Sequence, residues 1–129
     1  MEAKHFMVGD YVLNNEGMAF RVAQVNDACY GEHTSDLILE NGEEYKEVDA
    51  IEITEDRLER NGFKHYGDSG WWLEDDFFDI HIYEWSDSIW VFRYEGTEMN
   101  TPYEQRVISY FHELQHAFRD CGIEQELIL

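Results

Sequence analysis

Two runs of alternating side chains in the second half of the chain constrain its fold more than any other feature. Phe78, Ile80 and Ile82 alternate with more polar residues, and aromatic residues alternate again over 90–94, after a polar turn at 84–87. A period of two places every second side chain on the same face of a β-strand. The pattern predicts an antiparallel hairpin with one aromatic face.

The first 53 residues predict several short strands separated by turns. Asn14–Gly17 and Asn41–Gly42 provide residues that tolerate positive φ. Apolar or alternating segments precede, separate and follow these turns, over 8–13, 18–25, 36–39, 45–48 and 51–53. Short strands at such close spacing are typical of a small barrel or sheet on the scale of an SH3 domain.

Two helices are expected in the remainder. Thr54 is a suitable N-cap for a short helix that ends at Asn61–Gly62. Thr101, Pro102 and Glu104 resemble a capping box with proline at the first helical position. The apolar stripe that follows predicts one C-terminal helix of roughly 18 residues, packed on the hairpin. Its members are Val107, Phe111, Leu114, Phe118 and Cys121.

Together these patterns predict an α+β fold. Residues 1–53 form a barrel-like strand region, and residues 54–129 form an α+β region with the aromatic hairpin and the long C-terminal helix. We expect the two regions to pack as one compact unit, because a single proline and nine glycines leave little material for a linker.

The charge balance narrows the classes of partner. Acids outnumber bases 29 to 9, which gives a formal net charge of −20. A chain this negative is repelled by DNA, RNA and anionic membranes. The two cysteines, Cys29 and Cys121, form no CxxC motif, and no signal peptide or spanning segment is evident. We therefore expect reduced thiols and a cytoplasmic location.

The acids are concentrated in two groups, which are candidate partner-binding residues. The first group is Glu40, Glu43, Glu44, Glu47, Asp49, Glu52, Glu55, Asp56 and Glu59. The second is Glu74, Asp75, Asp76 and Asp79, next to Trp71 and Trp72. Acids in such number can simply keep an aromatic-rich protein in solution. They can also steer the chain onto a basic protein surface, with a tryptophan as anchor. Adjacent strand residues point to opposite faces, so at least one of the two tryptophans is expected outside the core.

The segment from His112 to His116 matches the H-E-x-x-H pattern of zinc hydrolases. On a helix its two histidines lie one turn apart and can share a metal, and Glu113 can act as general base. A third ligand would have to come from elsewhere, with His33, His81 or a carboxylate as candidates. The same spacing also fits two polar residues on the solvated face of an amphipathic helix.

The order of several short motifs resembles a group of small uncharacterised proteins of gut bacteria and their phages. The residues that carry the resemblance are Val8–Val12, Ile51–Glu55, Asn61–Phe63, the tryptophan-rich hairpin and Tyr110-x-His112-x-Leu114-Gln115. In that group the last helix carries His-x-Leu-Gln-Asn, and His116 stands where the asparagine would fall. The resemblance implies a cytosolic, phage-borne protein and assigns no activity.

These observations favour a non-enzymatic acidic protein that binds a basic protein surface. One form of the hypothesis is a nucleic-acid mimic that occupies the nucleic-acid channel of a host defence complex such as a CRISPR effector. Two alternatives stay open at this point. One is a zinc-dependent hydrolase that uses His112, His116 and Glu113, and the other is a structural or assembly protein that acts by self-association.

Overall fold

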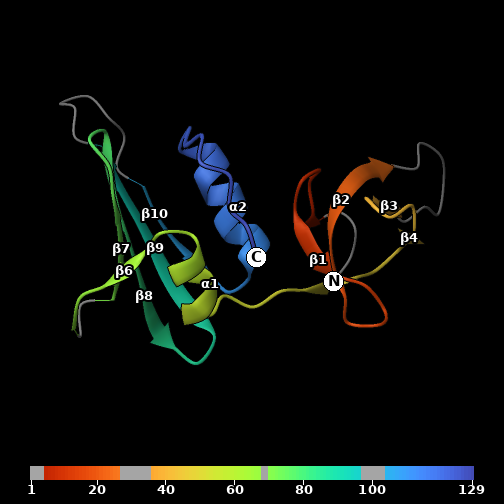
Figure 1. Cartoon of the computed structure of the whole chain (residues 1–129), viewed down its shortest axis with the longest axis horizontal. Helices are drawn as coiled ribbons and strands as arrows, with labels where there is room; N and C mark the ends of the chain where they lie inside the picture. Colours follow the sequence, from red (N-terminus) through yellow and green to blue (C-terminus); the bar gives the residue numbers. More distant parts are fainter. Residues whose placement is uncertain (1–4, 27–35, 68–69, 97–103) are drawn as a thin grey trace. The chain divides into compact units, whose positions relative to one another are not determined.

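The computed structural model describes residues 5–26, 36–67, 70–96 and 104–129 (Figure 1). The chain is α+β and divides into two compact units. Residues 1–51 form unit 1, and residues 52–129 form unit 2. Each unit contains one five-stranded antiparallel sheet, and both helices among the described residues belong to unit 2. None of these described helices is long and apolar enough to cross a membrane.

Unit 1 contains a sheet with the strand order β4-β3-β2-β1-β5. The strands are β1 (Tyr11–Leu13), β2 (Ala19–Asn26), β3 (Asp36–Leu39), β4 (Glu44–Tyr45) and β5 (Asp49–Ala50). Only residues 46–48 join the two edge strands β4 and β5, and such a link reaches about 14 Å. Five flat strands would separate these edges by about 19 Å, so the sheet must curl.

The curled sheet encloses its own apolar core. The buried members of this core are Phe6, Val12, Val22, Leu37, Leu39 and Val48. Val12, Leu37 and Leu39 alternate with less buried neighbours along β1 and β3, as expected for strands with one covered face.

Unit 2 contains a sheet with the strand order β10-β9-β8-β7-β6. Its elements are α1 (Glu55–Arg60), β6 (Lys64–His65), β7 (Trp71–Glu74), β8 (Phe78–Ser86), β9 (Ile89–Gly96), β10 (Glu104–Ile108) and α2 (Phe111–Asp120). The predicted aromatic hairpin is confirmed as β8 and β9. Its register sets Ile80 opposite Tyr94 and Ile82 opposite Phe92, and all four side chains are buried.

Both helices cover the same face of this sheet (Figure 1). Phe118 of α2 lies between two aromatic rings, with its centroid 6.2 Å from Phe92 of β9 and 6.2 Å from Phe63. Leu58 of α1 is also buried, and the predicted N-cap Thr54 accepts a hydrogen bond from the Arg57 N–H at 3.3 Å. The opposite face of the sheet carries no helix among the described residues, and we call it the open face.

The prediction of one long C-terminal helix is wrong. Residues 104–108 form the edge strand β10, and α2 begins at Phe111 and has only ten residues. Val107, which the spacing places in the helical stripe, instead pairs with Val91 of β9 and is 56% exposed. Pairing with β9 satisfies the backbone of this segment, so tertiary context overrides the helical spacing. Thr101 and Pro102 lie outside the described residues.

The segment after α2 is held against the end of α1 by a buried asparagine. The Asn61 carboxamide donates to the Ile128 carbonyl and accepts from the Ile128 N–H, both at 2.7 Å. It also donates to the Arg57 carbonyl at 2.7 Å, while Gln125 donates to the Asn61 carbonyl at 2.9 Å. This clamp fixes the course of residues 125–128 along unit 2.

Candidate functional site

The open face of the unit 2 sheet is arranged in rows that run across the strands. One row is set by the register of Trp72 with His81 and of His81 with Arg93. The Trp72 and His81 rings are stacked, with centroids 4.0 Å apart and an interplanar angle of 11°. The Tyr83 ring lies 5.1 Å from that of His81. These contacts build an aromatic patch on the exposed side of β7 and β8.

The neighbouring row consists of three acids, and we call it the carboxylate row. Glu74 of β7 pairs with Asp79 of β8, and Asp79 pairs with Glu95 of β9. All three side chains are exposed. Like charges placed directly opposite one another across strands destabilise a sheet. Arg93, two residues from Glu95, offsets only part of this charge. The row is therefore a feature that stability alone does not favour.

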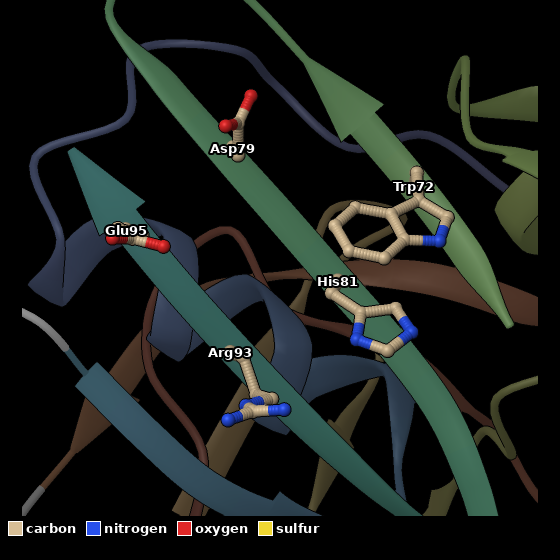
Figure 2. Close-up of a pocket in the computed structure, with 5 residues that line it drawn as sticks. All are labelled: Trp72, Asp79, His81, Arg93 and Glu95. Carbon is tan, nitrogen blue, oxygen red and sulfur yellow. The ribbon is translucent and has the colours of Figure 1, made fainter. Parts of the chain in front are cut away.

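A shallow pocket of about 190 Å³ joins the two rows. Figure 2 shows Asp79 and Glu95 toward one end of it, His81 and Arg93 toward the other, and Trp72 beside His81. The pocket thus offers carboxylates, a guanidinium and an aromatic surface side by side. Because it is open to solvent, it suits a contact with a protruding group of a larger partner better than the enclosure of a small molecule.

The two candidate tryptophan anchors point to opposite faces of the sheet. Trp71 pairs with Ile82, lies on the helix-covered face and is only 8% exposed. Its ring packs 4.9 Å from that of His65. Trp71 therefore belongs to the core. Trp72 alone of the pair reaches the open face, where it borders the carboxylate row.

The second acidic group lies in and beside the pocket, because it begins shortly after Trp72 in the sequence. Glu74 and Asp79 belong to the carboxylate row, while Asp75 and Asp76 form part of the turn between β7 and β8, and both are exposed. Glu95 was absent from the sequence-based group. Only the strand register brings it beside Asp79, because sixteen positions separate the two in the chain.

The first acidic group is divided between the two units. Glu40, Glu43, Glu44, Glu47 and Asp49 lie in unit 1, whereas Glu52, Glu55, Asp56 and Glu59 lie in unit 2. All nine side chains are exposed. In unit 1 the five acids occupy the β3–β4 turn, β4, the link 46–48 and β5. Each unit thus carries its own set of solvent-facing carboxylates.

Glu43 is the most constrained acid of the first group. Its carboxylate accepts hydrogen bonds from the Tyr45 hydroxyl and from the carboxamides of Asn41 and Asn14. These bonds, that of Tyr45 foremost, lower the pKa of Glu43 below its usual value. They also hold the β3–β4 turn in one conformation and leave Glu43 with less capacity to bind a partner than its neighbours.

The H-E-x-x-H segment forms the first turns of α2, and its glutamate has a structural role. The Glu113 carboxylate accepts hydrogen bonds from the N–H groups of Ser109 and Tyr110, both at 3.0 Å, and so caps the helix. His112 is 2% exposed, so its expected position on a solvated face is wrong. The buried positions of α2 extend from Ala117 round to His112, which covers about 220° of the helix circumference.

The ring centroids of His112 and His116 lie 5.5 Å apart, edge to face. Among the described residues, no group of three or more His, Cys, Asp or Glu side chains is placed to hold a metal ion. His33, one of the suggested third ligands, lies outside those residues, and His81 is committed to the Trp72 stack. The geometry therefore gives Glu113 the role of a helix cap and supplies no support for a general base.

No family model, curated protein or solved structure matches this chain.

Proposed function

We propose that this chain is a non-enzymatic acidic binding protein that engages a basic surface of another protein. The observation that carries the proposal is the carboxylate row, in which Glu74, Asp79 and Glu95 face solvent directly opposite one another. Such a row raises the energy of the free protein. A cationic partner would relieve the repulsion, so part of the binding free energy would come from this stored cost.

Aromatic side chains beside the carboxylate row could supply the affinity that charge alone does not. Exposed ion pairs contribute little to affinity, whereas partly buried aromatic side chains often supply the anchors of an interface. Trp72 belongs to the aromatic row that neighbours the carboxylate row. Phe77 lies in the turn between β7 and β8, and 67% of its surface is exposed. The formal net charge of −20 would further accelerate encounter with a basic partner and make association sensitive to salt.

A narrower form of the proposal is that the carboxylates imitate nucleic-acid phosphates. Three charges across two strand spacings correspond to about one charge per 5 Å. A single nucleic-acid strand carries one charge per about 3.4 Å of helix axis, which is within a factor of two. A protein groove built for such a strand, for instance in a host defence complex, is a suitable target for this face of unit 2.

The test compares two variants of equal charge. The row variant carries Glu74→Gln, Asp79→Asn and Glu95→Gln. The matched control carries Glu16→Gln, Glu84→Gln and Asp87→Asn, which change three exposed acids outside both groups. Each variant and the parent chain are immobilised and used for capture from a lysate of the native host at low salt, with elution by rising salt and identification of the eluted proteins.

We expect the parent and the matched control to retain the same basic proteins, and the row variant to lose them. Circular dichroism must show that all three chains are folded. Equal capture by the row variant and the matched control would overturn the proposal, because the charge of the chain and not the row would then determine binding.

A further inference from the structure

A second pocket lies at the end of the unit 2 sheet where β7 turns into β8. Its volume is about 360 Å³, and its walls come from this turn, from β9 and from residues 122–125 after α2. The side chains that matter for its chemistry are Asp75, Phe77, Phe78, Tyr94 and Glu124. Of its eight described lining residues, none is basic. Phe78 and Tyr94 share the helix-covered face with Ile80, so this pocket lies at the end of the sheet on the face opposite the carboxylate row.

The turn that forms one wall is held by its own hydrogen bonds. The Asp75 carboxylate accepts from the Phe77 N–H at 3.2 Å, and the Asp75 N–H donates to the Phe78 carbonyl at 2.9 Å. One Asp75 oxygen is thereby oriented by the turn itself. The exposed Phe77 ring projects from this same short turn.

The facing wall is fixed at both ends. Gly122 adopts a φ of +73°, and the Ile123 N–H donates to the Phe118 carbonyl at 2.9 Å, which closes α2 in a Schellman motif. At the other end, Gln125 donates to the Asn61 carbonyl. Because the chain's own hydrogen bonds hold both walls, a binding partner would lose little affinity to ordering of this pocket.

The composition of the walls selects a planar cation. Phe77 offers an exposed ring, and behind it lie the half-buried Phe78 and the buried Tyr94, whose ring centroids are 6.0 Å apart. Asp75 and Glu124 add an acidic residue to each wall. A guanidinium stacks on aromatic rings and forms paired hydrogen bonds with carboxylates. A lysine ammonium is more strongly hydrated and cannot stack in this way. An apolar group would leave the carboxylates unpaired, and an anion would be repelled by them.

We propose that this pocket receives an arginine side chain of the basic partner. The inference rests on the proposed function and adds to it the residue type that the partner must present where it wraps round the β7–β8 end of the sheet. In this arrangement the row supplies long-range attraction, and the pocket between the β7–β8 turn and residues 122–125 supplies a specific anchor.

The direct test uses the full ¹⁵N-labelled chain and the blocked tripeptide acetyl-Gly-Arg-Gly-amide. We expect saturable amide shifts at Phe77, Phe78 and residues 123–125. The peptide with citrulline in place of arginine keeps the shape of the side chain but loses its charge. Its affinity should be lower by a factor of about five or more. Equal shifts with citrulline, or shifts elsewhere, would overturn the inference. A third peptide carries lysine in place of arginine. If it bound with the same affinity as the arginine peptide, the choice of a guanidinium would be overturned.

Two aromatic substitutions separate this inference from the proposed function. Phe77→Ala removes the pocket ring without changing charge, and Trp85→Ala removes an equally exposed ring, 70% accessible, at the opposite end of β8. We expect Phe77→Ala to weaken arginine-peptide binding about fivefold and to reduce lysate capture, and Trp85→Ala to do neither.

The outcomes of the two experiments are distinguishable. If Phe77→Ala captures like the parent while the row variant captures nothing, the proposed function stands and the arginine pocket is overturned. If the row variant captures like its matched control, the proposed function is overturned whatever the peptide does.

Discussion

The side chain of Asn61 and the backbone of Ile128 form two hydrogen bonds of 2.7 Å each, across 67 positions of the sequence. Asn61 is 5% exposed, so its carboxamide depends on these partners in place of water. They tie the end of α1 to the segment that follows α2 and that forms one wall of the candidate arginine pocket. The buried amide is therefore a structural clamp that fixes one wall of that pocket.

Asn61→Ala should lower the free energy of unfolding of unit 2 by about 2 kcal/mol, because it removes several hydrogen bonds and leaves backbone groups unpaired. Urea unfolding followed by tryptophan fluorescence measures this, since Trp71, Trp72, Trp85 and Trp90 all lie in unit 2. Gln125→Ala removes a single bond of the same cluster and should cost less. An Asn61→Ala chain as stable as the parent would show that the clamp is dispensable.

Asp79→Asn should raise stability by roughly 0.5 kcal/mol, because it removes the central charge of the carboxylate row. The gain should be largest at low ionic strength and shrink as salt screens the neighbouring acids. Urea unfolding at two salt concentrations tests this, with Asp87→Asn as the control of equal charge. A loss of stability on neutralising Asp79 would mean that Arg93 already compensates the row.

Glu113→Ala should cost about 1 kcal/mol, because the carboxylate caps α2 through the N–H groups of Ser109 and Tyr110. Glu113→Gln should retain part of this stability, since an amide oxygen can still accept. Thermal unfolding of the three chains gives the order. If Glu113→Ala instead leaves stability unchanged and abolishes a zinc-dependent hydrolysis, the capping role is not the important one.

Gly70→Ala should destabilise unit 2 by about 2 kcal/mol or more. Gly70 has a φ of +90°, and a Cβ there would lie 2.8 Å from the Ile82 carbonyl oxygen and 2.9 Å from the Tyr83 Cβ. Gly67 provides the control, because its φ is +55° and a Cβ there meets nothing within 4 Å. Gly67→Ala should cost only the backbone strain. Equal losses from the two substitutions would rule out a steric conflict at β8.

Cys121 should react slowly with thiol reagents. Burial, and secondarily the charge of Glu104, raises the pKa of its thiol to about 11. At pH 8 the thiolate population is then about a hundredfold below that of an ordinary cysteine. The greater nucleophilicity of a more basic thiolate offsets part of this, so the net rate should fall about tenfold.

The rate should rise with pH up to about 11, and the same shift makes the folded state less stable as pH rises from about 9 to 11, because the unfolded thiol ionises first. Alkylation kinetics in a Cys29→Ser background measure the reactivity, and urea-unfolded protein supplies the reference rate. Equal rates for folded and unfolded chains at pH 8 would contradict the effect of burial.

Local patterns in the sequence predict the parts of the fold that local forces determine. The alternation around Ile80 and Phe92 identifies the hairpin, and Thr54 identifies the start of α1. The stripe of Phe111, Leu114 and Phe118 is buried as expected. Residues 104–108 could not be placed in this way, because their helical spacing competes with pairing to β9, and pairing is a long-range interaction.

The candidate site was predictable only in part, for the same reason. Glu74, Asp75 and Asp79 are neighbours in sequence, so their clustering is visible there. Glu95 joins them only through strand register. The burial of His112 was missed because a single stripe implies one covered face, whereas α2 is covered over more than half of its circumference.

The carboxylate row should be detectable by selection for stability alone, before any partner is identified. Most substitutions lower the stability of a folded chain, whereas neutralising a self-repelling acid raises it. A saturation screen for heat-resistant variants should therefore return Glu74, Asp79 and Glu95 as gains. If the proposed function holds, the positions where such a screen finds improvement would outline the recognition surface, because binding would then be what retains the repelling acids.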